Sequence, residues 1–260
     1  MPTYRASDGA TLTYLDRGPH GDIPLLFLHG WQGAGAIWAL VIDELAERHR
    51  TLAVDIRGFA GSNEAPGPYT VDGFANDLSD LLATLDLDPL VVVGHSMGAA
   101  IAQRFAIDRP EAVEGLVLVA PVAARGPEFS PRLEAMFRAT AGNTANTNAW
   151  LAKLTHREPL PHVTALLRAA AATVSERAAL ESFGSWSRLS FEDEARTIET
   201  PTLVIAPAED RPMTPDWVRA RVADVIAGSR LEIIPSAGHY VPLEAPKAIA
   251  NSIEAFVASL

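Results

Sequence analysis

The chain has 260 residues, which is enough for one α/β domain around a single large core, with room for a small insertion. Its formal net charge of −11 argues against nucleic acids and anionic membrane surfaces as partners, because binding to either needs a surplus of Lys and Arg. The absence of cysteine excludes disulfides, thiolate catalysis and Cys-ligated metal sites.

The N-terminal segment predicts two strands and no targeting signal. Residues Thr3 to Ala6 and Thr11 to Asp16 have strand patterns, and the turn residues Ser7-Asp8-Gly9 separate them. No apolar stretch here has the length of a signal peptide, and none in the chain approaches the roughly 18 apolar residues that span a bilayer. We therefore expect a cytoplasmic protein with no membrane partner.

The rest of the sheet is predicted by short apolar runs without alternation, which are typical of strands buried on both faces of a parallel sheet. These runs are Leu25 to Leu28, Leu52 to Val54, Leu90 to Val93 and Leu116 to Val119, and two later strands are predicted at Thr202 to Ile205 and Leu231 to Ile234. Segments with helical spacing lie between or after them, at Ile37 to Glu47, Val71 to Leu87, Ala99 to Ile107, Asp216 to Ile226 and Ala245 to Ala258. Alternating strands and helices predict a doubly wound α/β sheet.

The alternation is interrupted between residues 122 and 191, where only helical patterns occur. Apolar residues share one helical face in each of three groups: Leu133, Met136 and Phe137; Trp150, Leu151 and Leu154; and Val163, Leu166 and Leu167. The polar stretch Gly142-Asn143-Thr144 predicts a loop between the first two groups. We therefore predict a core domain of residues 1–121 and 192–260 and a helical cap of residues 122–191.

A nucleophile is predicted where the apolar strand Leu90 to Val93 runs into Gly94-His95-Ser96-Met97-Gly98 and then into a helix. In this context Gly-x-Ser-x-Gly forms a tight strand-to-helix turn, and the serine hydroxyl is exposed above the carboxyl edge of the sheet. The N-terminus of the following helix favours negative charge that develops there. The alternative is a glycine-rich turn with a capping serine.

A general base and its carboxylate partner are predicted on two later loops. His239 follows the strand Leu231 to Ile234, and Asp210 follows the strand that ends at Ile205, so both lie at the same edge as Ser96. A serine hydroxyl needs a base, and the base needs a carboxylate to hold its tautomer. The chain order Ser, Asp, His is the order that this arrangement uses, although the adjacent Glu209 could in principle replace Asp210.

An oxyanion hole is predicted from two backbone amides. The strand Leu25 to Leu28 ends in His29-Gly30-Trp31, and the loop that follows can direct the Trp31 amide at the site. The Met97 amide, directly after the nucleophile, would be the second donor. Without the other motifs, His29-Gly30 would be a simple strand-ending turn.

Five motifs, in the same order along the chain, resemble those of the α/β-hydrolase family over nearly the whole length. They are Leu28-His29-Gly30-Trp31, Asp55-Ile56-Arg57-Gly58-Phe59-Ala60-Gly61-Ser62, Gly94-His95-Ser96-Met97-Gly98, Pro201-Thr202-Leu203-Val204-Ile205 and Gly238-His239-Tyr240-Val241-Pro242-Leu243-Glu244. The resemblance implies the α/β-hydrolase fold, with a mostly parallel eight-stranded sheet and a helical cap inserted after the sixth strand. Within this family the chain most resembles small serine esterases, lactonases and cofactor-free perhydrolases, which implies that it needs no cofactor. Its scattered histidines, with no His-x-x-x-His pair near a carboxylate, predict no metal site.

The chain departs from the pattern of this group at two positions. Pro207 stands where the family usually has glycine before the acid, and Gln32 follows Trp31 where perhydrolase-like members tend to have proline. Haloalkane dehalogenases and epoxide hydrolases are also similar, but they use an aspartate nucleophile where this chain has Ser96.

The insert predicts a largely apolar pocket above the active edge of the sheet. Part of its apolar side chains would pack the cap against the core and the rest would line the pocket. The candidates for the wall are Met136, Phe137, Trp150, Leu154, Phe183 and Trp186. Such a wall favours a hydrophobic or aromatic ester or lactone, whereas Arg132 and Arg138 could instead hold a substrate carboxylate.

These features together predict a serine hydrolase, a monomer or homodimer, that cleaves a small ester or lactone through an acyl-enzyme on Ser96. One alternative keeps the fold and uses the His–Asp pair as a base for cofactor-free perhydrolase, dioxygenase or lyase chemistry. Another is a receptor-like member that binds its ligand without turnover.

Overall fold

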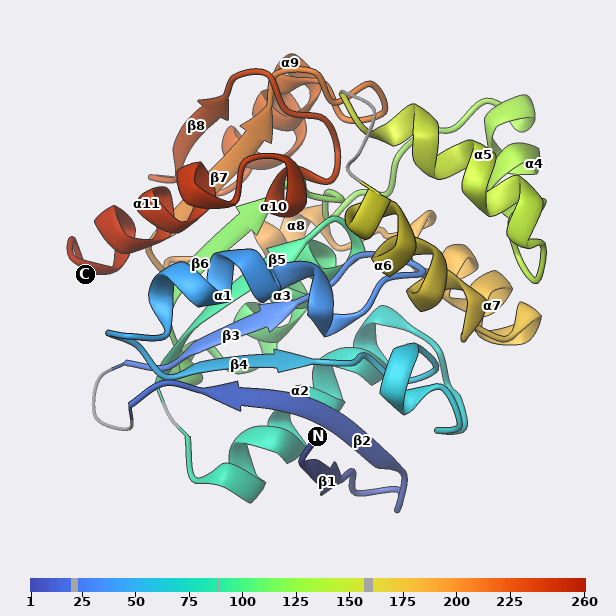
Figure 1. Cartoon of the computed structure of the whole chain (residues 1–260). Coiled ribbons are helices and arrows are strands. Elements are labelled where there is room, and N and C mark those ends of the chain that lie inside the picture. Colours follow the sequence, from blue (N-terminus) through green and yellow to red (C-terminus); the bar gives the residue numbers. More distant parts are fainter. Residues whose placement is uncertain (20–22, 88, 157–160) are drawn as a thin grey trace.

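The computed structural model describes residues 1–19, 23–87, 89–156 and 161–260 (Figure 1). It confirms the predicted α/β-hydrolase fold: an eight-stranded sheet in the order β1-β2-β4-β3-β5-β6-β7-β8, in which only the pairings of β2 with β1 and β4 are antiparallel. The strands are β1 (Thr3–Arg5), β2 (Thr11–Arg17), β3 (Leu25–Leu28), β4 (Thr51–Val54), β5 (Leu90–His95), β6 (Val113–Val119), β7 (Thr202–Pro207) and β8 (Arg230–Ile234).

Helices cover both faces of the sheet, which explains the unbroken apolar runs. In β3, Leu25 and Phe27 belong to one core cluster, whereas Leu26 and Leu28 belong to the other. Successive side chains of a strand point to opposite faces, so each face of this strand needs apolar residues. The first cluster includes residues of α1 (Ala39–Leu45) and α11 (Pro246–Val257), and the second includes residues of α2 (Val71–Leu85), α3 (Met97–Asp108) and α8 (Glu192–Ala195).

Two helical segments differ in form from the prediction. The segment expected as one helix from residue 37 begins with a 3₁₀ turn, Gly35–Trp38, before α1. The segment expected from residue 216 is α9 (Pro215–Val218), which continues as a wider π-type turn over Arg219–Ala223. The closing segment agrees with the prediction as α11, and the short α10 (Val241–Glu244) precedes it because Pro246 keeps Ala245 out of the helical conformation.

In the described residues between β6 and β7, four longer helices precede the short α8. They lie together on the right of Figure 1, beyond the ends of β3 and β4. They are α4 (Pro131–Arg138), α5 (Thr144–Leu154), α6 (Pro161–Ala172) and α7 (Glu176–Trp186). The side chains of Ser130, Asn143 and Ser175 cap α4, α5 and α7 by accepting backbone N–H bonds. The division into core and cap at residues 122 and 191 remains a prediction.

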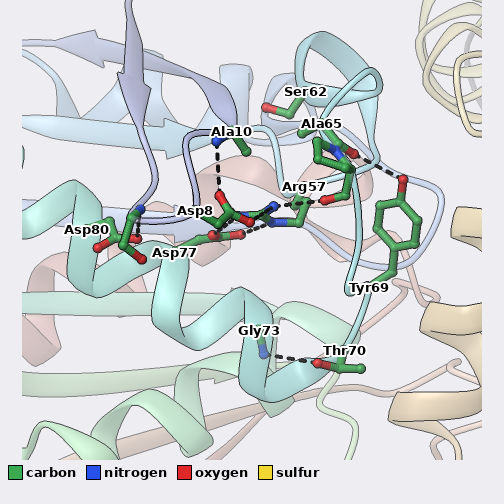
Figure 2. Close-up of polar contacts among 12 residues, drawn as sticks. Asp8, Ala10, Arg57, Ser62, Ala65, Tyr69, Thr70, Gly73, Asp77 and Asp80 are labelled. Carbon is green, nitrogen blue, oxygen red and sulfur yellow. Dashed lines mark hydrogen bonds and ion pairs between the residues drawn. The ribbon is translucent and has the colours of Figure 1, made fainter.

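A buried arginine ties the N-terminal hairpin to the loop after β4 and to α2 (Figure 2). Arg57 donates to both carboxylate oxygens of Asp77, at 2.8 and 2.5 Å, and to Asp8 at 2.7 Å and the Pro66 carbonyl at 2.8 Å. Only 4% of the Arg57 side chain and 8% of the Asp77 side chain are exposed. Burial raises the pKa of Asp77, and the Arg57 guanidinium counteracts this rise.

Replacement of Arg57 by Met is expected to lower the free energy of unfolding by about 3–5 kcal/mol, because it leaves the buried Asp77 carboxylate without its partner. In the variant, the influences that remain on the Asp77 carboxyl are burial and the nearby Asp8 and Asp80, and each of them raises its pKa. The folded-state pKa then lies above the unfolded value, so the loss is largest at neutral pH. It shrinks as the pH falls towards the ordinary Asp value of 3.8.

Urea unfolding of the wild type and the Arg57→Met variant across this pH range measures the effect. The matched control is Arg17→Met, because the Arg17–Asp43 ion pair is about half exposed. We expect this control to change the free energy of unfolding by less than about 1 kcal/mol. Equal effects of the two substitutions would contradict the stabilising role of the buried pair.

Candidate functional site

Ser96 occupies a sharp turn between β5 and α3. Its backbone has φ +54° and ψ −117°, a conformation that is strained for a residue with a side chain. The turn requires glycine on both sides: a Cβ at Gly94 would lie 2.4 Å from the Gly98 carbonyl oxygen, and a Cβ at Gly98 would lie 2.5 Å from that of Leu28. The Gly-x-Ser-x-Gly pattern therefore follows from the close approach of α3 to β3 and β5.

The structure brings the three predicted side chains into one hydrogen-bonded relay. The Nε2 atom of His239 lies 3.0 Å from the Ser96 hydroxyl, and its Nδ1 atom lies 2.8 Å from a carboxylate oxygen of Asp210. A carboxylate can only accept, so Nδ1 carries the proton and Nε2 is free to accept from the hydroxyl. The exposed fractions are 7% for Ser96, 2% for Asp210 and 6% for His239.

The turn after β7 decides which of two adjacent acids faces the histidine. The Asp210 amide donates to the Pro207 carbonyl at 3.3 Å, which closes a tight turn and directs the Asp210 side chain inward. The Glu209 side chain is half exposed, and its carboxylate lies 3.9 Å from Nδ1 of His156 instead. Pro207 is accommodated because it ends the strand and contributes its carbonyl to the turn.

The two amides predicted for an oxyanion hole donate to no described residue. Met97 is the first residue of α3, so its N–H has no partner within the helix. The conformation of the loop that carries the Trp31 amide is held by neutral His29, whose Nδ1–H donates to the Gly30 carbonyl at 2.7 Å while Nε2 accepts from the Ile56 amide at 3.0 Å. Burial lowers the pKa of His29, which keeps the ring uncharged.

The side chains of the same loop are hydrogen-bonded to α7 and to the turn between α4 and α5. The Trp31 indole donates to the Ser182 hydroxyl at 3.0 Å, and the Gln32 amide group donates to the Thr140 hydroxyl at 2.9 Å. Gln32 has φ +54°, whereas proline is restricted to φ near −65°. A proline at this position is therefore incompatible with the path of the loop in this chain.

The His239 loop is held by contacts that the sequence did not indicate. The His239 amide donates to the Leu154 carbonyl at 2.7 Å, and its own carbonyl accepts from Nε2 of His95 at 2.8 Å. The Glu244 carboxylate accepts from the amides of Gly238, at 3.2 Å, and His156, at 2.8 Å. Glu244 thus joins the His239 loop to the chain after α5.

His95 stays neutral at this position. Its ring is fully buried, and burial together with the adjacent His239 sets its pKa well below the ordinary histidine value. A neutral His95 can donate from Nε2 to the His239 carbonyl without placing a second positive charge next to the His239 ring, whose centre lies 5.0 Å away. The only sequence signal for His95 and Glu244 was their place in the quoted motifs.

A narrow cavity of about 40 Å³ opens onto Ser96 and His239. Four of the six predicted wall residues line it: Phe137, Trp150, Leu154 and Trp186. The other lining residues were not among these six candidates, although Leu151 lies on the predicted helical face of Trp150 and Leu154, and several others neighbour the relay or the Trp31 loop in the chain. They are Gly30, Trp31, Gln32, His95, Thr147, Leu151, Pro212, Met213 and Tyr240.

The structure does not bring the other candidates for substrate contact to this cavity. Met136 lines a separate pocket between α4 and α5, and Phe183 is fully buried behind the wall, with its ring 5.3 Å from that of Phe137. Arg132 is exposed, and Arg138 bonds Glu134 at 2.9 Å. Neither arginine lines the cavity, so the structure offers no support for the carboxylate-binding alternative.

Two further properties concern the described part of the chain only. There, no group of three or more His, Asp or Glu side chains is arranged to hold a metal ion. No helix of that part is both long and apolar enough to cross a bilayer.

Comparison with known proteins relates this arrangement to a family of enzymes. The model of the alpha/beta hydrolase family matches residues 25–252. A Mycobacterium tuberculosis protein provisionally named non-heme bromoperoxidase BpoC is 32% identical, with 96% of this chain and 98% of the relative covered. The enol-lactonase from Burkholderia xenovorans has a TM-score of 0.87 at 26% identity, covering 99% of this chain and 100% of that one. An esterase from Exiguobacterium antarcticum shares the fold, with a TM-score of 0.91 at 21% identity and 98% coverage of both chains.

Proposed function

Because the chain belongs to the α/β-hydrolase family, we propose that it is a serine hydrolase that cleaves a small, neutral carboxylic ester or lactone. The observation that carries the proposal is the relay of Ser96, His239 and Asp210 through contacts of 3.0 and 2.8 Å. Similarity to an enol-lactonase at 26% identity over the whole chain is consistent with this reaction class.

The first half-reaction forms an acyl-enzyme. The Ser96 oxygen attacks the carbonyl carbon while Nε2 of His239 takes the hydroxyl proton, and Asp210 stabilises the imidazolium that results. The Trp31 and Met97 amides hold the oxyanion of the tetrahedral intermediate. When this intermediate collapses, the bond to the leaving oxygen breaks, and His239 donates the proton that it took from Ser96 to that oxygen, which leaves as the alcohol.

The second half-reaction releases the acid. His239 takes a proton from a water molecule, whose oxygen attacks the acyl carbon, and then returns that proton to Ser96 as the ester bond to the enzyme breaks. Atoms balance with one water consumed. In a lactone the alcohol and the acid are parts of one molecule, so the product is a hydroxy acid.

The cavity wall favours a neutral substrate. Its described lining residues include no Lys, Arg, Asp or Glu, and most are aromatic or aliphatic. A charged substrate group would lose its hydration there without gaining an ionic partner. The volume of about 40 Å³ leaves room for a short acyl or alkoxy group beside Ser96.

The proposal is tested with a panel of aryl esters, aliphatic esters and lactones, together with covalent labelling by a fluorophosphonate. We expect turnover of at least one class and one phosphonyl group per chain, located on Ser96 by mass spectrometry. Oxygen uptake with a heteroaromatic substrate and no acyl-enzyme would instead support base-driven chemistry, and tight ligand binding without turnover would support a receptor-like role. Either result would contradict the proposal.

Perhydrolysis is a second candidate because a whole-length relative carries the name of a non-heme bromoperoxidase. The same acyl-enzyme would be attacked by hydrogen peroxide in place of water, which yields a peracid. Repeating the panel with hydrogen peroxide and monitoring bromide oxidation distinguishes the two outcomes. Bromide oxidation that requires both an acyl donor and Ser96 would identify perhydrolysis.

The hydrogen bonds of the Glu244 carboxylate to the Gly238 and His156 amides predict that Glu244 holds His239 in position. Glu244→Ala removes both acceptors for the Gly238 and His156 amides, and we expect kcat to fall about tenfold, since bonds to a charged acceptor are among the stronger hydrogen bonds. Glu244→Gln retains one carbonyl acceptor and should lose less. Steady-state kinetics and the rate of fluorophosphonate labelling measure the effect, and unchanged kcat in Glu244→Ala would contradict the role.

A further inference from the structure

The Gln32 side chain lies in the wall of the cavity that contains Ser96, and only 9% of this residue is exposed. The hydrogen bonds of Thr140 distinguish its amide oxygen from its amide nitrogen. The Thr140 hydroxyl lies 2.7 Å from the Phe137 carbonyl, which can only accept, so the hydroxyl proton is used in that bond. At its contact of 2.9 Å with Gln32 the hydroxyl must therefore accept, and the donor there is Nε2. The other end of the amide is the acceptor Oε1.

The Oε1 atom of Gln32 is a free acceptor, because no described residue donates a hydrogen bond to it. Six side-chain N or O atoms in the described part of the chain are both unpartnered and closed to a bound molecule by burial. Oε1 is not one of these closed atoms, so it retains accessible surface. Since Gln32 is otherwise buried and borders the cavity, this oxygen is available to a molecule that binds beside Ser96.

The neighbours of the Gln32 amide group also belong to the cavity wall. Phe137, whose carbonyl holds the Thr140 hydroxyl, lines the cavity, and so does Thr147, whose hydroxyl donates to the Thr140 carbonyl at 3.0 Å. At the other end of its side chain, Gln32 directly follows Trp31, whose amide is proposed to hold the oxyanion. The side chain therefore runs from the oxyanion loop to the turn after α4, and its acceptor lies in the wall near the scissile carbonyl.

An accessible amide oxygen favours molecules that bring a hydrogen-bond donor. Water can satisfy such an oxygen before a substrate binds. A substrate with a methyl group at this place displaces the water and leaves the oxygen without a partner, whereas a hydroxyl or an amide N–H replaces the lost bond. The Tyr240 hydroxyl also lines the cavity, but burial raises its pKa and keeps it protonated, so it can donate as well as accept. The Gln32 oxygen can only accept.

We propose that Oε1 of Gln32 accepts a hydrogen bond from an O–H or N–H group of the substrate. The enzyme would then select neutral esters or lactones that carry a hydroxyl or an amide N–H within a few bonds of the scissile carbonyl. This inference rests on the proposed function, because it assumes that the ester occupies the cavity beside Ser96. Gln32 is a specificity-determining residue in this account and takes no part in proton transfer.

Matched substrates that exchange a hydroxyl for a methyl group test the proposal. The acyl pairs are p-nitrophenyl glycolate with propanoate and p-nitrophenyl 3-hydroxypropanoate with butanoate. 2-Hydroxyethyl acetate with propyl acetate places the exchange in the alcohol, and 2-hydroxy- with 2-methyl-γ-butyrolactone places it on a lactone. In at least one pair we expect Gln32→Met to lower the ratio of kcat/KM, hydroxyl over methyl, by about 5- to 20-fold relative to wild type. Intrinsic reactivity cancels in this comparison of variants, and a general disturbance of folding would lower both members of a pair alike.

Two controls assign the effect to the acceptor oxygen. p-Nitrophenyl methoxyacetate with butanoate exchanges an ether oxygen for a methylene, and because an ether cannot donate, Gln32→Met should leave this ratio unchanged. Gln32→Glu keeps an acceptor oxygen in either protonation state. It should therefore retain the hydroxyl preference that Gln32→Met loses, even where it lowers the rates of both members of a pair.

Unchanged ratios of all the hydroxyl pairs in Gln32→Met would overturn the inference, as would an equal loss in Gln32→Glu or in the ether pair. Loss of the hydroxyl preference in Tyr240→Phe but not in Gln32→Met would also overturn it and would assign recognition of the hydroxyl to Tyr240. Each of these results would leave Ser96-dependent hydrolysis intact. Absence of any Ser96-dependent hydrolysis by the wild type would overturn the proposed function itself, so the two failures are distinguishable.

Discussion

Ser96→Ala is expected to lower kcat/KM for every ester that the wild type hydrolyses by about 10⁵- to 10⁶-fold, because no acyl-enzyme can form. The residual rate would come from the oxyanion hole and from binding alone. Hydrolysis of p-nitrophenyl esters by extensively purified protein measures the effect, and the loss of fluorophosphonate labelling provides an independent readout.

The Ser96→Ala variant should remain folded. Alanine has the same Cβ as serine, so the strained backbone at φ +54° is unchanged and only the hydroxyl contact with His239 is lost. We expect the free energy of unfolding to change by no more than about 1.5 kcal/mol. A variant that is folded and retains more than a few per cent of wild-type turnover would show that another group is the nucleophile.

Asp210→Asn is expected to lower kcat by about 10⁴-fold with a small effect on KM, because the amide leaves the geometry intact but favours the wrong tautomer of His239. In the wild type the carboxylate accepts from Nδ1 of His239 at 2.8 Å. An asparagine that donates to Nδ1 would leave the His239 proton on Nε2. Because Nε2 would then be protonated, it could not accept the Ser96 proton. Steady-state kinetics with one ester measures the loss.

The adjacent residue provides the matched control. Glu209 has a half-exposed side chain and lies near His156, not near His239, so Glu209→Gln should keep kcat within about twofold of wild type, as expected for a surface substitution. The pair of variants decides between the two acids that the sequence left open. A large loss in Glu209→Gln with little change in Asp210→Asn would reverse the assignment.

The sequence by itself determined the sheet and the position of Ser96, because both depend on residues that are close together in the chain. Unbroken apolar runs at Leu25–Leu28 and Leu90–Val93 predicted strands buried on both faces, and both are strands of the parallel part of the sheet. The turn at Ser96 follows from its own glycines and from the strand and helix that flank them. Carboxyl ends of parallel strands share an edge, so loops far apart in the chain could be expected to meet there.

Only the tertiary structure decided which side chains face one another. A helical pattern shows which residues share a face but not what that face meets, so it could not separate Phe137, in the cavity wall, from Met136, which lines another pocket. The pairing of Arg57 with Asp77 joins two residues among many charged ones and has no local signal. The segment predicted as one helix from Asp216 is α9 followed by a π-type turn, because packing outweighs a weak pattern. Local rules specify elements and turns, whereas contacts between distant segments depend on how those elements pack.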